Sequence, residues 1–81
     1  MKNVSKKIDI NDYLSLPYTI EVIPEKDGGY FVKVKELTGC MTEADTWEKI
    51  EDMIKDAMRE WIKTALENNM EIPLPEKVNT V

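Results

Sequence analysis

The feature that most restricts how this chain can fold is a long amphipathic stretch from Thr46 to about Asn68. When this stretch is projected as a helix at 100° per residue, its apolar side chains fall within an arc of about 140° and its charged side chains lie opposite. Such a helix is roughly 35 Å long, and its apolar stripe must be buried against another element. The stripe consists of Trp47, Ile50, Ile54, Ala57, Met58, Trp61, Ile62 and Ala65. The sequence therefore predicts a core-facing helix with Trp47 and Trp61 on its buried face.

The start of this helix carries carboxylates with two different expected roles. Asp45 is a good N-cap, and Glu48, three residues later, completes an Asp-x-x-Glu variant of the capping box. Glu51 projects into the apolar arc, where an unpaired buried carboxylate is costly. We therefore expect Glu51 at the margin of the sheet, either exposed or paired at a subunit interface.

Three extended segments precede the helix and supply the surface that it needs. Residues 18–23 and 30–35 alternate apolar and polar side chains and are rich in β-branched or aromatic residues, which is typical of strands. The turn Asp27-Gly28-Gly29 between them tolerates the positive φ angles of a hairpin. A shorter run at 40–43 indicates a third strand. The sequence thus predicts a three-stranded antiparallel meander with the long helix packed on one face.

Shorter segments complete an α+β fold of order α-β-β-β-α-β. Residues 8–16 can form a short helix. Residues 70–75 follow the long helix as an extended piece, which we expect to return as a short fourth strand, parallel to the first or third, at a sheet edge. We divide the chain into a flexible basic N-terminal arm (1–7), a single domain (8–75) and a C-terminal tail (76–81).

The charge of the chain is unevenly distributed. The first seven residues carry three lysines, and the remaining 74 carry 8 basic against 16 acidic residues, while the whole chain has a formal net charge of −5. The acidic body repels phosphate backbones and attracts basic partners, so direct nucleic-acid binding is disfavoured except through the basic arm. The alternative is that these carboxylates form a solvated acidic surface with no binding role.

Length and cysteine content restrict the setting in which the chain works. Its 81 residues make a single small core, and the sheet face opposite the helix is left open, so we expect a homodimer or a higher homo-oligomer. The single cysteine, Cys40, excludes an internal disulfide, and no apolar run reaches the roughly 18 residues of a membrane span. We therefore expect a cytoplasmic protein that contacts no membrane.

Few residues offer catalytic chemistry. The chain has no histidine, which excludes Ser-His-Asp and Cys-His pairings and the imidazole ligands of zinc. We interpret Cys40 as a buried structural thiol, the alternative being a nucleophile activated by the nearby helix start. Carboxylates gather around the turns and the helix start, as in magnesium-dependent nucleases, but without a recognisable metal-binding spacing. We predict a protein that is not an enzyme and has no catalytic residue, metal or cofactor.

Three ordered segments carry a resemblance to a known family. They are Leu16-Pro17-Tyr18-Thr19-Ile20-Glu21-Val22-Ile23-Pro24, then Asp27-Gly28-Gly29-Tyr30-Phe31-Val32, then Glu36-Leu37-x-Gly39-Cys40-Met41-Thr42-x-x-Asp45-Thr46. With the long helix and the closing Ile72-Pro73-Leu74-Pro75, they make the chain resemble the HicB antitoxin family from Pro17 through Pro75. The resemblance implies a partial RNase H-like fold without the active site of that enzyme.

The resemblance also implies a partner, a HicA-type toxin, which is a small basic RNA-cleaving protein of double-stranded-RNA-binding fold. The catalysis of such a toxin is expected to rest on a histidine, so this histidine-free chain cannot be the toxin. An antitoxin of this kind binds the basic RNA-binding surface of the toxin and sterically blocks its active site. The residues that we expect to bind the partner are Asp27, Glu36, Glu43, Asp45 and Glu51.

Two further expectations concern DNA and an alternative role. Many members of the family also bind operator DNA through a separate C-terminal segment. Only six residues follow Pro75, so we expect no such DNA binding unless the basic arm replaces that segment. The alternative to an antitoxin is an orphan homo-oligomeric protein of the HicB fold, which binds a regulator or a small ligand and has no toxin partner.

Overall fold

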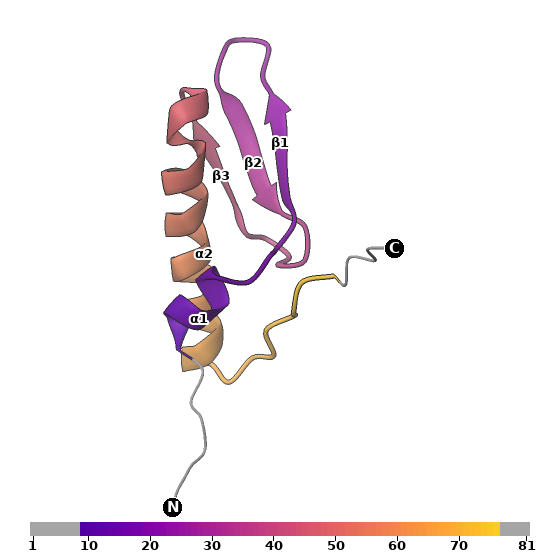
Figure 1. Cartoon of the computed structure of the whole chain (residues 1–81), viewed down its shortest axis with the longest axis vertical. Helices are drawn as coiled ribbons and strands as arrows, with labels where there is room; N and C mark the ends of the chain where they lie inside the picture. The colour runs from indigo at the N-terminus through magenta and orange to yellow at the C-terminus, as the bar shows by residue number, and fades with distance from the viewer. Residues whose placement is uncertain (1–8, 77–81) are drawn as a thin grey trace, which may run out of the picture.

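The computed structural model describes residues 9–76 and shows one long helix packed against a three-stranded antiparallel sheet (Figure 1). In chain order the elements are the short helix α1 (Ile10–Leu14), the strands β1 (Ile20–Pro24), β2 (Tyr30–Val34) and β3 (Met41–Ala44), the 3₁₀ turn η1 (Trp47–Lys49) and the long helix α2 (Ile50–Glu67). The strands lie in the order β1-β2-β3, and both neighbouring pairs are antiparallel. The expected α+β class, the meander and the helix on one face are confirmed.

The register of the sheet separates a buried face from an open one. Val22, Val32 and Thr42 are aligned across the three strands, and Val32 is completely buried. Ile23 and Met41 lie on the opposite face by the alternation of side chains along a strand, and each is 48% exposed. The sheet thus uses one face for the core and leaves apolar side chains on the other.

The core lies between α2 and the buried face of the sheet. Ile54, Met58 and Ile62 recur at four-residue intervals on α2, and all three are buried. Leu37, in the connection between β2 and β3, has no exposed surface and belongs to the same core. Full burial of a side chain of this size contributes about 1.5–3 kcal/mol. Through Leu37, the β2–β3 connection therefore contributes to the hydrophobic core as the buried residues of the strands do.

The prediction of a fourth strand at 70–75 is wrong. Residues 70–76 have no regular secondary structure, and the sheet of the described chain has three strands. Pro73 and Pro75 have no backbone N–H to donate to a neighbouring strand. The segment is held instead by individual contacts, such as the hydroxyl of Tyr18, which donates to the Pro73 carbonyl at 2.6 Å. The resemblance implies a partial RNase H-like order that ends in a fourth strand. The described residues do not form this last strand.

The starts of both helices differ from those expected. Asp45 does not cap the long helix: a 3₁₀ turn begins after Thr46, and neither η1 nor α2 has a side-chain cap. The first helix, Ile10–Leu14, is shorter than the expected 8–16, and a capping box formed by Asp9 and Asp12 stabilises its start. There the Asp9 carboxylate accepts from the Asp12 N–H at 3.2 Å, and the Asp12 carboxylate accepts from the Asp9 N–H at 3.1 Å.

Parts of the chain expected to be terminal extensions fall outside this description. The N-terminal arm (1–7) and the C-terminal tail (76–81), except Glu76, lie outside the described residues. The division into arm, domain and tail therefore stays a prediction. In residues 9–76, no helix combines the length and the apolar character needed to cross a bilayer.

Candidate partner-binding site

Four of the five residues expected to bind the partner lie toward one end of the sheet, where the β1–β2 hairpin meets the start of α2 (Figure 1). A β-carbon built on Gly29 would stand 3.2 Å from the Ala44 carbonyl oxygen, so the hairpin lies directly against the end of β3. Glu36 lies in the β2–β3 connection, at the opposite end. We define the acidic end as the four residues together with one neighbour: Asp27, Glu43, Asp45, Glu48 and Glu51.

The acidic end concentrates negative charge that the surrounding structure does not neutralise. Residues 43–52 contain five carboxylates and one lysine. Among the ion pairs within residues 9–76, only one involves an acidic-end carboxylate, that of Glu51. Like charges gathered in one region raise the local potential and attract a cationic surface at long range. This end of the molecule is therefore the strongest candidate for binding a basic partner.

Glu51 does not enter the apolar stripe. Its side chain is 76% exposed, and its Oε2 lies 3.1 Å from the Nζ of Lys55, one helical turn further along α2. An exposed pair at this spacing contributes only about 0.3–0.5 kcal/mol. The expectation that Glu51 is exposed is confirmed, and the carboxylate remains accessible to a partner.

The carboxylate of Glu36 is engaged within the chain. Its Oε1 accepts from the Thr19 N–H at 2.9 Å, and its Oε2 accepts from the Thr19 hydroxyl at 2.8 Å and from the Glu76 N–H at 3.0 Å. An ion pair between Lys35 and Glu76, at 3.4 Å, lies beside it. Partial burial alone would raise the pKa of Glu36, but the hydrogen bonds from Glu76 and Thr19 outweigh this effect and lower the pKa to about 2. Glu36 therefore fastens the C-terminal segment to the entrance of β1.

These hydrogen bonds predict a contribution to stability that is sensitive to acid. The folded-state pKa of Glu36 lies below its ordinary value of 4.5, so the contribution is complete above about pH 4.5 and is lost as the pH falls toward 2. Because the carboxylate is partly exposed to solvent, we expect its contribution to the free energy of unfolding to be about 1–2 kcal/mol. Urea unfolding at high and low pH should show that Glu36→Gln loses this pH dependence and that Glu67→Gln keeps it. Identical profiles for the wild type and Glu36→Gln would contradict the assignment.

Trp47 does not join the core, contrary to the projection of the helix. Its side chain is 63% exposed, and its ring meets Tyr30 edge to face, with centroids 5.7 Å apart and planes at 75°. Trp47 lies in η1, and a 3₁₀ turn advances about 120° per residue, so three residues shift the phase by roughly 60° from that of an α-helix. The ring therefore faces a groove at the acidic end. That groove is lined by Ile20, Val22, Trp47, Glu48, Ile50, Glu51 and Ile54.

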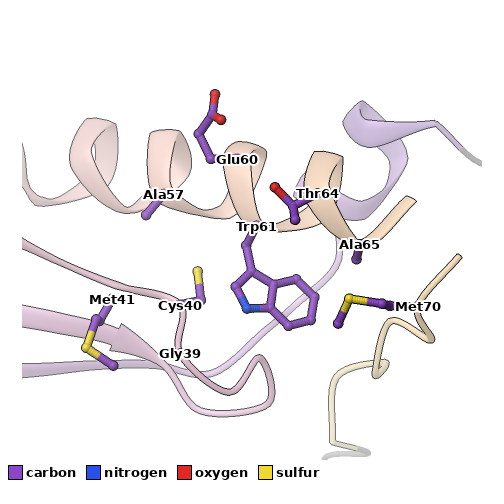
Figure 2. Close-up of a pocket in the computed structure, with 9 residues that line it drawn as sticks. All are labelled: Gly39, Cys40, Met41, Ala57, Glu60, Trp61, Thr64, Ala65 and Met70. Carbon is purple, nitrogen blue, oxygen red and sulfur yellow. The ribbon is translucent and has the colours of Figure 1, made fainter. Parts of the chain in front are cut away.

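A second groove, at the C-terminal half of α2, contains the single cysteine (Figure 2). Figure 2 shows the Trp61 ring directed from α2 toward the loop at Gly39, and its Nε1–H donates to the Thr38 carbonyl at 2.9 Å. Cys40 is buried, as expected, and burial raises the pKa of its thiol to about 11, so the thiol is neutral at physiological pH. In residues 9–76, no three acidic, cysteine or histidine side chains are grouped as a metal ion would require.

The match to a known family covers the stretch that forms the sheet and the long helix. The family model described as HicB-like antitoxin of bacterial toxin-antitoxin system matches residues 17–81. Antitoxin HicB 1 of Photorhabdus laumondii is 33% identical over 64 residues, which are 79% of this chain and 41% of that relative. A UPF0150 protein of Thermoplasma acidophilum is 34% identical over 58 residues, which are 72% of this chain and 84% of that relative. The chain thus spans 41% of the length of the first relative and most of the second. It belongs to the family of HicB-like antitoxins of bacterial toxin–antitoxin systems.

Proposed function

We propose that this chain is the antitoxin of a toxin–antitoxin pair and that it inhibits a HicA-type RNA-cleaving toxin by binding to it. The observation that carries the proposal is the family match over residues 17–81. The acidic end supports it, because a protein that cleaves RNA needs a basic surface to hold phosphates. Such a surface is electrostatically complementary to the acidic end.

The proposed inhibition is steric, with electrostatic attraction accelerating the encounter. Opposite potentials raise the association rate of two proteins. Once docked, the antitoxin occupies the surface that would otherwise bind RNA phosphates, so the substrate does not reach the active site of the toxin. This mechanism requires no chemistry from the present chain, and we propose that it is not an enzyme. Both proteins would act in the cytoplasm, where the toxin meets its RNA.

Co-expression tests this proposal. The probe is the small basic protein encoded by the reading frame beside this gene. That protein alone is expected to arrest growth, and co-expression of the present chain is expected to restore growth and to yield a complex in size-exclusion chromatography. A toxin variant whose histidine is replaced by alanine is the control, because it should bind without affecting growth. If neither the active toxin nor its alanine variant forms a complex with the present chain, or if no such reading frame exists, the result would count against an antitoxin role.

A second candidate, a homo-oligomeric regulator without a toxin partner, is favoured by the open face of the sheet. Ile23 and Met41 are each 48% exposed there, and Phe31 is paired with Ile23 on the central strand. Two copies that pack these faces together would remove apolar surface from water. For this candidate, light scattering should show an oligomer that Ile23→Lys dissociates, and the wild type should bind no toxin.

A further inference from the structure

A groove in two adjoining parts runs along the junction of β1 and α2. Its first part has a volume of about 430 Å³ and begins at Trp47. A second part of about 210 Å³ continues toward α1 and reaches Leu14. The two parts share Ile20, Glu51 and Ile54 in their walls, so they adjoin each other along this junction, and both are open to solvent.

The groove combines exposed apolar side chains with an acidic rim. Trp47 is 63% exposed and Ile20 is 38% exposed, although both line the groove. Glu48 and Glu51 are the charged residues of its first part. Lys55 already pairs with Glu51, whereas Glu48 forms no ion pair within residues 9–76. A complementary occupant needs an apolar side chain to cover the exposed rings and methyl groups and a cation for the rim.

The free edge of β1 lies along the same groove. The Thr19 carbonyl accepts from the Lys35 N–H at 2.9 Å, so the backbone of this odd-numbered residue faces β2. In an antiparallel pair, every second residue turns its N–H and C=O away from the neighbouring strand. The backbone groups of Ile20 and Val22 therefore point outward, where no strand of residues 9–76 pairs with them. An extended segment can add to this edge and place alternate side chains in the groove.

We infer that this groove receives an extended, basic segment of the toxin, which adds to the edge of β1 and inserts an apolar side chain beside Trp47. The inference rests on the proposed function and specifies where and how the toxin binds. A second copy of this chain fits less well. A symmetric contact through the groove would bring Glu48 and Glu51 toward the same residues of the other copy, in a chain whose net charge is −5. A basic segment gains from both the charge and the apolar floor.

Replacement of Trp47 by alanine tests the groove. It is expected to weaken binding of the histidine-inactivated toxin about 30-fold, mainly through faster dissociation, because a large aromatic anchor is lost. Leu66→Ala is the matched control: it truncates another partly exposed apolar side chain of α2, outside the groove, and should change the affinity less than about 2-fold. A second readout is amide hydrogen exchange, which should slow at Ile20 and Val22 when the toxin binds. Circular dichroism verifies that both variants are folded.

The outcomes separate this inference from the proposed function. If the wild-type chain does not bind the toxin, the proposed function fails. If it binds, unchanged affinity of Trp47→Ala or unchanged exchange at Ile20 and Val22 overturns the inference alone. Dissociation of a wild-type homodimer by Trp47→Ala, measured by light scattering, would assign the groove to a second copy and would equally overturn it.

Discussion

Replacement of Leu37 by alanine is expected to lower the free energy of unfolding by about 3 kcal/mol. Leu37 has no exposed surface and packs in the core with residues of α2 and of the sheet. Its backbone is fixed on both sides, because its N–H donates to the Val34 carbonyl at 3.3 Å and its carbonyl accepts from the Cys40 N–H at 2.9 Å. The connection therefore resists collapse into the cavity that truncation leaves, which adds to the lost transfer free energy. Domains of this size are stable by only about 5–10 kcal/mol, so the loss is a large share.

Leu74→Ala is the matched control for this experiment. It removes the same atoms from a side chain that is 66% exposed, and the free energy of unfolding should change by less than about 0.5 kcal/mol. Urea unfolding followed by circular dichroism measures both variants. Equal losses for Leu37→Ala and Leu74→Ala would show that the β2–β3 connection is not part of the stabilising core.

The hairpin and the body of the long helix could be predicted because their signals are local. The alternation at 18–23 and 30–35 identifies two strands without knowledge of the rest of the chain. The turn between them has φ angles of 94° at Gly28 and 86° at Gly29, which glycine adopts without strain. The helical period likewise marks the side chains that α2 buries. The burial of these side chains can therefore be predicted from the periodicity of apolar residues within a segment of about ten to twenty residues.

The segments that were wrongly predicted depend on effects that a periodic pattern does not contain. The path of residues 70–76 is determined by Tyr18 and Glu36, which are 55 and 40 residues away from their partners in the sequence. The position of Trp47 follows from a switch from 3₁₀ to α-helical geometry, which changes the rotation per residue. A helical projection at 100° per residue places Trp47 in the core because it applies α-helical geometry to the whole stretch, including the 3₁₀ turn.

The candidate site could be predicted in kind but not in arrangement. The excess of carboxylates over lysines and arginines indicates a surface that suits a basic partner. Only the folded chain shows that Glu36 is hydrogen-bonded internally, at the end of the sheet away from Asp27, Asp45 and Glu51. The groove beside Trp47 is lined by residues of β1 and of α2, which are far apart in the sequence and are brought together only by the fold. Binding of a partner by these residues stays a prediction.

The largest functional effect is expected from reversing charge at the acidic end. In the double variant Asp45→Lys with Glu48→Lys, lysines replace two carboxylates. Neither carboxylate forms an ion pair within residues 9–76, so the substitutions remove no ion pair from the described fold. The association rate constant for the histidine-inactivated toxin should fall about 100-fold at low salt, because attraction becomes repulsion. Stopped-flow kinetics measures this effect. The difference from wild type should shrink with added salt, since the Debye length decreases from about 10 Å at 0.1 M to about 3 Å at 1 M.

The control places the same charge change at the other end of the molecule. Glu60→Lys with Glu67→Lys also raises the net charge by four, from −5 to −1, through exposed residues in the second half of α2. If the acidic end steers the encounter, this control should slow association by less than about 5-fold. Equal slowing by the two double variants would mean that net charge alone attracts the toxin. Surface charges act mainly on association, whereas loss of an apolar anchor acts mainly on dissociation. The charge-reversal and Trp47→Ala variants therefore separate capture of the toxin from its retention.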